Sequence, residues 1–275
     1  MTRRSMMGAA AGLAALAGAA PAASAGRLKQ SVARWCYSKM SLEDLCANCA
    51  RLGMSGIDLV SYQDWPVIQK AGLVPAMTPG AGGIADGWNR KENHDKLEKQ
   101  MRENIERAAA AKVPNVITFS GNRKGMADEE AKDNCVAGLN RVKKIAEDAG
   151  VTINIELLNS KVDHKDYQCD HTAWGVDVCK RIGSPRVKLL YDIYHMQIME
   201  GDVIRTIRDN IQYIGHFHTG GVPGRHELDG TQELNWKTIA AAIADLNYTG
   251  YFAHEFVPVR DPMASLEEAV KICTV

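Results

Sequence analysis

Four residues that can bind metal ions or transfer protons recur at similar intervals in the second half of the chain. They are Glu156, Asp192, His218 and Glu255, separated by 36, 26 and 37 positions. Three carboxylates brought together without compensation would repel one another and lose solvation at a considerable cost. If these residues converge, either some carboxylates are protonated or a divalent cation lies among them. Oxygen ligands with one imidazole favour Mn²⁺ or Mg²⁺, with Co²⁺ as a further candidate.

The elements that must position these residues alternate along the chain. Short segments rich in Val, Ile and aromatic residues predict strands, and longer amphipathic segments between them predict helices. Eight strands, each followed by a helix, are the number that closes a parallel barrel. We therefore predict an α/β protein, a (β/α)8 TIM barrel, with residues 26–275 as one domain. The predicted strands are 31–37, 56–60, 73–77, 115–120, 151–157, 187–193, 214–219 and 251–256, and the predicted helices are 41–53, 65–72, 94–113, 128–150, 172–183, 202–211, 235–246 and 265–273.

Active sites of such barrels lie at the carboxyl ends of the strands. Glu156, Asp192, His218 and Glu255 each stand near one strand end and are about one strand–helix unit apart, so we expect them to be neighbours in space. His216 shares a strand face with His218 and lies one layer deeper, where it either supports the site or has no role in it.

Composition and charge limit the classes of partner. The chain has 33 basic and 33 acidic residues, so it lacks the positive surplus that phosphate binding needs, and we do not expect nucleic acid as a partner. Seven cysteines are present, and Cys46 and Cys49 fall inside a predicted helix, where buried, unreactive thiols are the favoured interpretation over a redox pair.

The first 25 residues differ from the rest. Arg3 and Arg4 precede an Ala/Gly/Leu segment that ends in Ala23-Ser24-Ala25, which is the order of a twin-arginine-type signal peptide. We predict cleavage after Ala25 and export to the periplasm, without stable membrane association afterwards. A membrane anchor is the weaker alternative, because the segment is dominated by Ala and Gly.

Three segments resemble the hydroxypyruvate isomerase family of the xylose-isomerase-like TIM-barrel superfamily, which also contains the ketose 3-epimerases. These segments are INIELLN (153–159), YDIYHMQIMEGD (191–202) and GGVPGRHELDGTQELNW (220–236). The resemblance implies a metal-dependent isomerase that converts hydroxypyruvate to tartronate semialdehyde through an enediolate. It also implies that Glu156 and Glu255 are the two acid/base carboxylates and that both bind the metal ion with Asp192 and His218.

The resemblance extends to substrate-binding residues. It implies that His195 and Arg225 bind a small hydroxycarbonyl compound or sugar, and that Glu227 orients Arg225 or the loop near it. Asn159, in the loop after the strand at 151–157, joins this group. Homo-oligomerisation stays open.

The chain also departs from the hydroxypyruvate isomerases. They carry Gln where this chain has His218, whereas the ketose 3-epimerases carry His, so a ketose 3-epimerase or another sugar isomerase or epimerase is the alternative. An endonuclease IV-type phosphoesterase and a non-catalytic sugar-binding barrel are further alternatives. Trp65 and Trp88 either stack on a sugar or pack in the core, and the segment 78–88 is expected to be a flexible lid.

Overall fold

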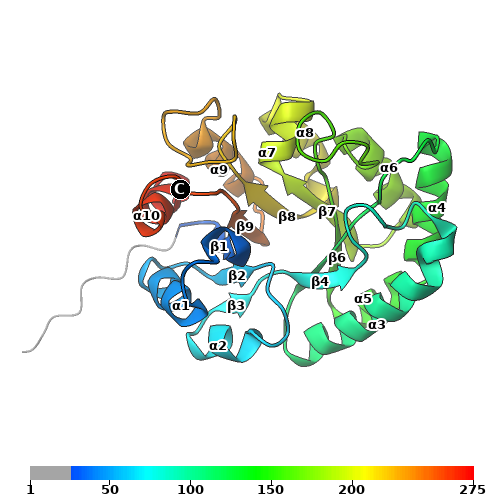
Figure 1. Ribbon diagram of the computed structural model, residues 1–275, viewed down its shortest axis with the longest axis horizontal. Coiled ribbons are helices and arrows are strands. Elements are labelled where there is room, and N and C mark those ends of the chain that lie inside the picture. Colours follow the sequence, from blue (N-terminus) through cyan, green and yellow to red (C-terminus); the bar gives the residue numbers. More distant parts are fainter. Residues whose placement is uncertain (1–25) are drawn as a thin grey trace, which may run out of the picture.

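The computed structural model describes residues 26–275, so the predicted signal peptide at 1–25 lies outside the described residues. Nine parallel strands form one sheet that curves into a nearly closed barrel, in the order β3-β2-β1-β9-β8-β7-β6-β5-β4. Figure 1 shows the strands at the centre with the helices around them, and the first strand, β1, beside the last, β9. The strands are β1 Lys29–Ala33, β2 Gly56–Asp58, β3 Val74–Pro75, β4 Thr78–Ala81, β5 Asn115–Thr118, β6 Thr152–Glu156, β7 Val187–Asp192, β8 Ile214–Thr219 and β9 Tyr251–His254.

Two short strands, β3 and β4, share the third position of the barrel. β3 pairs with β2 and β4 pairs with β5, and only two residues separate them along the chain. Pro75 and Pro79 have no N–H group to donate to a strand ladder, and the chain changes its pairing partner between them. Counted by position, the barrel has eight strands, which confirms the predicted (β/α)8 TIM barrel.

The helices cover the outside of the barrel and follow the predicted order with two differences. The predicted helix 128–150 is two helices, because the chain turns at Arg141 and Val142. Residues 193–199 form a helix that was not predicted, and the Asp192 side chain caps it by accepting from the His195 N–H. The helices are α1 Leu42–Arg51, α2 Trp65–Lys70, α3 His94–Ala110, α4 Asp128–Asn140, α5 Lys143–Ala149, α6 Thr172–Ile182, α7 Ile193–Met199, α8 Val203–Asn210, α9 Trp236–Ala244 and α10 Pro262–Cys273, with short 3-10 helices η1 Arg34–Tyr37, η2 Lys91–Asn93 and η3 Ile211–Tyr213.

Apolar side chains pack on both faces of the strands. A large cluster fills the layer between strands and helices, and a small one formed by Met77, Ile117 and Leu190 lies apart from it. Because side chains alternate along a strand, Asp192 shares the face of Leu190, whereas Leu189 and Tyr191 belong to the outer layer. The acidic residue therefore points into the barrel.

The cysteines do not form a redox centre in the described structure. Cys46 and Cys49 are buried in α1, and all seven cysteines, which lie within residues 26–275, are unpaired. Burial raises the pKa of Cys49 to about 12, so its thiol is unreactive at neutral pH. Between residues 26 and 275, none of the helices is long and apolar enough to cross a membrane.

Candidate active site

The four spaced residues come together at the carboxyl end of the barrel. Glu156 is the last residue of β6, Asp192 the last of β7, and His218 the last but one of β8, while Glu255 directly follows β9. Asp192 and His218 are direct partners across the β7–β8 pairing. One ligand atom from each of the four side chains lies within 4.8 Å of the other three, and all four residues are buried. The convergence expected from their spacing is therefore present.

The imidazole of His218 is at the centre of this cluster. Its Nδ1 atom is 2.5 Å from Oε2 of Glu255, 3.6 Å from Oε1 of Glu156 and 4.0 Å from Oδ2 of Asp192. Within the described chain, neither ring nitrogen makes a hydrogen bond of acceptable geometry, although the ring is fully buried. A buried, unpartnered nitrogen surrounded by carboxylate oxygens is the environment of a metal ligand.

The charges of the site also fit a divalent cation. Four buried carboxylates belong to the site and its support (Asp58, Glu156, Asp192 and Glu255), and Arg225 offsets one of them. His218 would bind a metal ion as the neutral imidazole, so a cation with two positive charges would offset two more of the carboxylates. Three oxygen donors with one imidazole suit Mn²⁺, Mg²⁺ or Co²⁺ better than a metal that prefers thiolates. The residues of the site therefore fit a divalent metal ion.

The two glutamates have different protonation tendencies. Burial and the nearby Glu255 carboxylate raise the pKa of Glu156, against the opposing effect of His218, to about 7. Burial would also raise the pKa of Glu255, but Arg225, His218 and the Trp35 N–H together lower it below the ordinary value. One carboxylate is thus close to half-protonated near neutral pH, and the other is ionised. Two neighbouring carboxyl groups whose pKa values are moved apart in this way are typical of acid/base sites.

Arg225 lies directly over the acidic residues. Its Nη2 atom donates to Oδ2 of Asp192 and to Oε2 of Glu255, each at 2.6 Å, and its Nε donates to the backbone carbonyl of Glu255 at 3.0 Å. The loop that carries it is tightly folded: the Gly221 N–H donates to the carbonyl of His226, and a Cβ at Gly221 would lie 2.2 Å from the backbone oxygen of Glu227. Only glycine fits there, and the turn directs Arg225 inward.

His195 and Asn159 stand behind Arg225. Nε2 of His195 is 2.8 Å from Nη1 of Arg225, and its Nδ1 is 2.7 Å from Nδ2 of Asn159. Burial, with the charge of Arg225, lowers the pKa of His195 well below its ordinary value, so the ring is neutral. Asn159 also donates to Asp163, which accepts from the Tyr194 hydroxyl as well. The structure therefore brings His195, Arg225 and Asn159 to the site.

Glu227 does not join this group. Its Oε1 atom accepts from the Ser265 hydroxyl and from the backbone N–H groups of Val259 and Arg260. Within residues 26–275 its side chain makes no hydrogen bond or ion pair to Arg225. Glu227 instead ties the loop at 220–236 to the segment that leads into α10, which matches the second of the two roles expected for it.

A second buried group, formed by Asp58 and His216, lies beneath His218. Oδ2 of Asp58 is 2.5 Å from Nε2 of His216 and 3.4 Å from Nε2 of His218, and all three side chains are fully buried. Burial would raise the pKa of Asp58, but His216 and His218 lower it overall, so the carboxylate is ionised. Such carboxylate–histidine contacts fix the orientation of a metal-binding imidazole. The sequence suggested the depth of His216 but not its partner, because Asp58 and His216 are 158 residues apart in the chain.

The tryptophan at the site is neither of the two that the sequence analysis considered for sugar stacking. Trp65 and Trp88 are 7% and 0% exposed and pack in the core, and the Trp88 N–H donates to Thr118. The segment 78–88, which was expected to be a flexible lid, contains strand β4 at residues 78–81 and the buried Trp88. Trp35, in η1, is instead the tryptophan at the mouth of the barrel, and its indole N–H donates to Glu255 at 2.6 Å.

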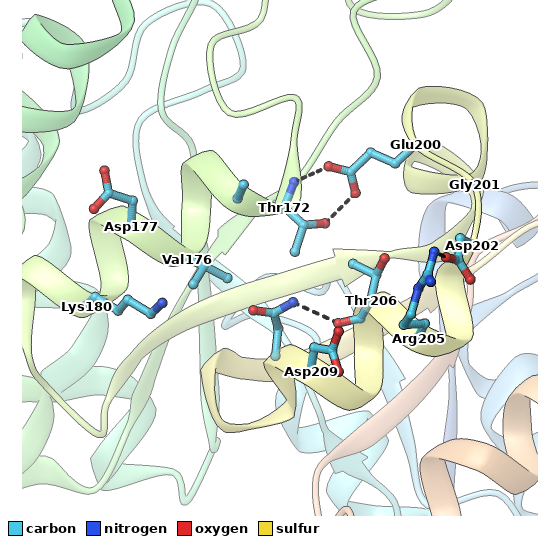
Figure 2. A pocket seen from close by; sticks show the side chains of 12 residues that line it. Thr172, Val176, Asp177, Lys180, Glu200, Gly201, Asp202, Arg205, Thr206 and Asp209 are labelled. Atoms are coloured by element: carbon cyan, nitrogen blue, oxygen red, sulfur yellow. Dashed lines mark hydrogen bonds and ion pairs between the residues drawn. The ribbon is translucent and has the colours of Figure 1, made fainter.

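A surface groove between α6 and α8 lies away from this cluster (Figure 2). Several of its polar side chains pair with one another: the Glu200 carboxylate accepts from the backbone N–H and the hydroxyl of Thr172, and Arg205 pairs with Asp202. Glu200 thereby caps the first turn of α6. The groove does not bring together unpaired ionisable groups from several strands, so the barrel mouth is the better candidate.

By sequence, the chain matches one family and parts of several proteins named as isomerases or epimerases. Residues 46–273 match the family described as xylose isomerase-like TIM barrel. A 2-oxo-tetronate isomerase of Cupriavidus necator is 37% identical over 117 residues, which cover 42% of this chain and 44% of that protein. A Danio rerio protein provisionally named hydroxypyruvate isomerase is 30% identical over 138 residues, covering 50% of each. The chain spans about half the length of the curated relatives it matches.

Solved structures show the same fold at low identity. A Brucella melitensis protein described as an AP endonuclease of family 2 has a TM-score of 0.76 and 20% identity, over 88% of this chain and 96% of that one. A D-psicose 3-epimerase crystallised in the presence of D-fructose has a TM-score of 0.70 and 18% identity, over 89% and 90% of the two chains. At these identities the likeness establishes the shared barrel.

Proposed function

We propose, starting from the fact that the chain belongs to the xylose isomerase-like TIM barrel family, that it is a metal-dependent isomerase of small hydroxycarbonyl compounds. The observation that carries this proposal is the buried convergence of Glu156, Asp192, His218 and Glu255. Relatives named as isomerases support the reaction class. A phosphoesterase or a non-catalytic sugar-binding barrel would not require two carboxylates with such different proton affinities on either side of one imidazole.

The two glutamates are suited to move a proton between adjacent carbons. One takes a proton from the carbon beside the carbonyl, and the electron pair of the broken C–H bond forms the double bond of an enediolate. The proton returns to the former carbonyl carbon, while a hydroxyl proton passes between the two oxygens, so that an α-hydroxyketone becomes an α-hydroxyaldehyde. Glu156, with its pKa near 7, can accept and donate a proton at neutral pH, and Glu255 is ionised and ready to accept one.

Other side chains of the site would bind the metal ion and the substrate. Asp192 and His218 would complete the set of metal ligands with the two glutamates. A divalent cation held by these four residues would polarise the carbonyl group and stabilise the negative charge of the enediolate. Arg225 presents a guanidinium at the same place, and a guanidinium is suited to a carboxylate or a pair of adjacent oxygens.

Hydroxypyruvate, which would yield tartronate semialdehyde, is the substrate we propose first. It carries a carboxylate for Arg225 and a hydroxymethyl carbon for proton removal, and the relatives named above are isomerases of 2-oxo acids. A ketose 3-epimerase is the second candidate. The imidazole of His218 among the predicted ligands favours it, since those enzymes carry His at this position, and return of the proton to the opposite face of one carbon would complete epimerisation.

Solvent exchange tests the proposal independently of the position of equilibrium. The full chain is incubated with Mn²⁺ in D₂O with hydroxypyruvate, D-fructose or D-psicose, and deuterium incorporation into the substrate is followed by NMR. We expect exchange into one of these compounds, loss of exchange with a chelator, and loss in E156Q and E255Q. E43Q, at an exposed position of α1, is the matched control and should keep the wild-type rate. Full exchange in E156Q or E255Q would contradict the assignment.

A further inference from the structure

We propose that Trp35 is a positioning residue for Glu255 and that its exposed ring forms the wall against which the carbon chain of the substrate packs. The inference rests on the proposed function, since it concerns one of the two carboxylates assigned there. It adds a residue from the first strand–helix loop, which the sequence did not indicate, and it bears on the length of substrate that the site accepts.

The hydrogen bond from Trp35 divides the two oxygens of Glu255 between different tasks. The indole N–H donates to Oε1 at 2.6 Å, whereas Oε2 faces Nδ1 of His218 at 2.5 Å and Nη2 of Arg225 at 2.6 Å. The terminal torsion of a glutamate side chain is broad, so a carboxylate held at one oxygen alone can rotate. With Oε1 bound to a rigid indole, Oε2 stays directed toward the cluster.

The loop that carries Trp35 is itself held in place. The Arg34 guanidinium donates to the carbonyls of Tyr37 and Met40, at 2.6 and 3.0 Å, and so closes the turn after β1. The Tyr37 ring packs edge-on against Phe256, the residue after Glu255, with ring centroids 6.4 Å apart. β1 and β9 are paired strands. The indole and the carboxylate are therefore fixed relative to each other by adjacent elements.

The ring of Trp35 is unusually accessible for a tryptophan of this protein. Trp35 is 45% exposed, whereas the other four tryptophans are 7% exposed or less. Its inner side is close to Arg225, whose guanidinium carbon lies 5.9 Å from the ring centroid. The remaining exposed large apolar residues (Tyr62, Val162, Val257 and Val259) also follow strands β2, β6 and β9, at the same end of the barrel.

An apolar surface beside a charged centre is the usual lining of a site that binds the C–H groups of a ligand while polar groups orient it. A three-carbon acid bound at the cluster has little carbon chain left to reach this surface. A ketose of five or six carbons has several such groups. The contribution of the ring should therefore grow with the length of the substrate.

The variant W35F separates the two roles, because it removes the N–H and keeps an aromatic ring. Loss of a group that orients a metal ligand typically lowers metal affinity or activity by about 10–100-fold. We expect W35F to lower Mn²⁺ affinity in calorimetry, or the rate of solvent exchange, within this range, with KM changed by less than about twofold. W174F is the matched control, since the Trp174 N–H has no hydrogen-bond partner within residues 26–275.

The variant W35A removes the ring as well. We expect it to raise KM beyond the value for W35F, and to do so more for D-fructose or D-psicose than for hydroxypyruvate. W35Q retains a hydrogen-bond donor without a ring. We expect it to recover part of the exchange rate lost in W35F and to show the raised KM expected of W35A.

Fluorescence tests the same contacts in the unmodified protein, even if W35F does not fold. Trp35 is the tryptophan that acrylamide can reach. We therefore expect Mn²⁺ to quench the fluorescence of Trp35, and the compound that undergoes exchange to protect this fluorescence from acrylamide. Wild-type Mn²⁺ affinity, exchange rate and KM in W35F would overturn the positioning role while leaving the proposed function intact. Equal KM for W35F and W35A with every substrate would overturn the wall. If the wild type neither binds Mn²⁺ nor exchanges protons, the proposed function fails and the role of Trp35 with it.

Discussion

Replacing Asp58 by Asn would test whether the buried carboxylate beneath His218 supports metal binding. Asp58 is fully buried, and its Oδ2 atom is 2.5 Å from His216 and 3.4 Å from His218. Asn has nearly the same shape, so D58N removes the charge and leaves the packing. With the charge gone, the electrostatic attraction between Asp58 and Nε2 of His218 is lost, and the ring is held less firmly with Nδ1 toward the carboxylates.

The magnitude follows from the contacts that are lost. A hydrogen bond to a charged group contributes about 1.5–3 kcal/mol, and D58N weakens one such bond, that to His216. For a chain of this size, about 2 kcal/mol corresponds to a fall in Tm of roughly 4–8 °C. Because folding lowers the pKa of Asp58, this contribution is present at neutral pH and is lost as the pH falls below about 4. For Mn²⁺, loss of the supporting carboxylate should cost about 10–100-fold in affinity.

Calorimetric titration with Mn²⁺ and thermal unfolding without metal measure the two effects separately at pH 7. D209N, at an exposed position near the end of α8, is the matched control and should match the wild type in both assays. Mn²⁺ affinity within twofold of wild type in D58N, together with an unchanged Tm, would refute the reasoning. A lower Tm with unchanged Mn²⁺ affinity would restrict Asp58 to a role in stability.

Three further predictions concern the electrostatics of the site and the first residues of the chain. Glu156 has a pKa of about 7, and the carboxylates around His218 raise the pKa of that imidazole above its ordinary value. Both groups must lose a proton to bind a metal ion, so Mn²⁺ affinity should rise at least about tenfold per pH unit below pH 7 and continue to rise above it, measured by calorimetry. R225A should destabilise the metal-free protein by about 3–5 kcal/mol, since it removes the guanidinium that pairs with Asp192 and Glu255. Mn²⁺ should restore most of the lost Tm, and a Tm that does not recover with Mn²⁺ would argue against a cation between these carboxylates. Changing Arg3 and Arg4 together to Lys should retain the protein in the cytoplasm of a bacterial host, whereas the unmodified chain should appear in the periplasm with Gly26 at its N-terminus; equal export of both would refute the twin-arginine signal.

Much of the fold could be predicted from the sequence because barrel strands and helices differ in period and length. The strands that carry the site, β6 to β9, were predicted close to their observed limits, since each is a short apolar run between turn residues. The third strand was not, because Pro75 and Pro79 interrupt its hydrogen bonding and divide it between two neighbours. Helix α7 was missed because its seven residues continue the apolar run of β7, and such a run does not reveal its period.

The site residues on regular elements could also be predicted from the sequence, whereas those held by loops could not. Residues at strand ends could be placed together because the regular repeat of the barrel brings equivalent positions to one end. Contacts made by loops could not be placed in this way. The direction of Arg225 depends on a tight turn around Gly221, and the hydrogen bond from Trp35 to Glu255 joins loops at opposite ends of the chain. The anchoring of Glu227 by α10 has the same origin.

An anomalous diffraction map of crystals soaked in Mn²⁺ tests the central claim most directly. We predict one strong peak within about 2.5 Å of oxygen atoms of Glu156, Asp192 and Glu255 and of Nδ1 of His218, with the Arg225 guanidinium withdrawn from the two carboxylates it now contacts. A map without a peak at the barrel mouth, or with its strongest peak among other side chains, would contradict the assignment of these residues as a metal site.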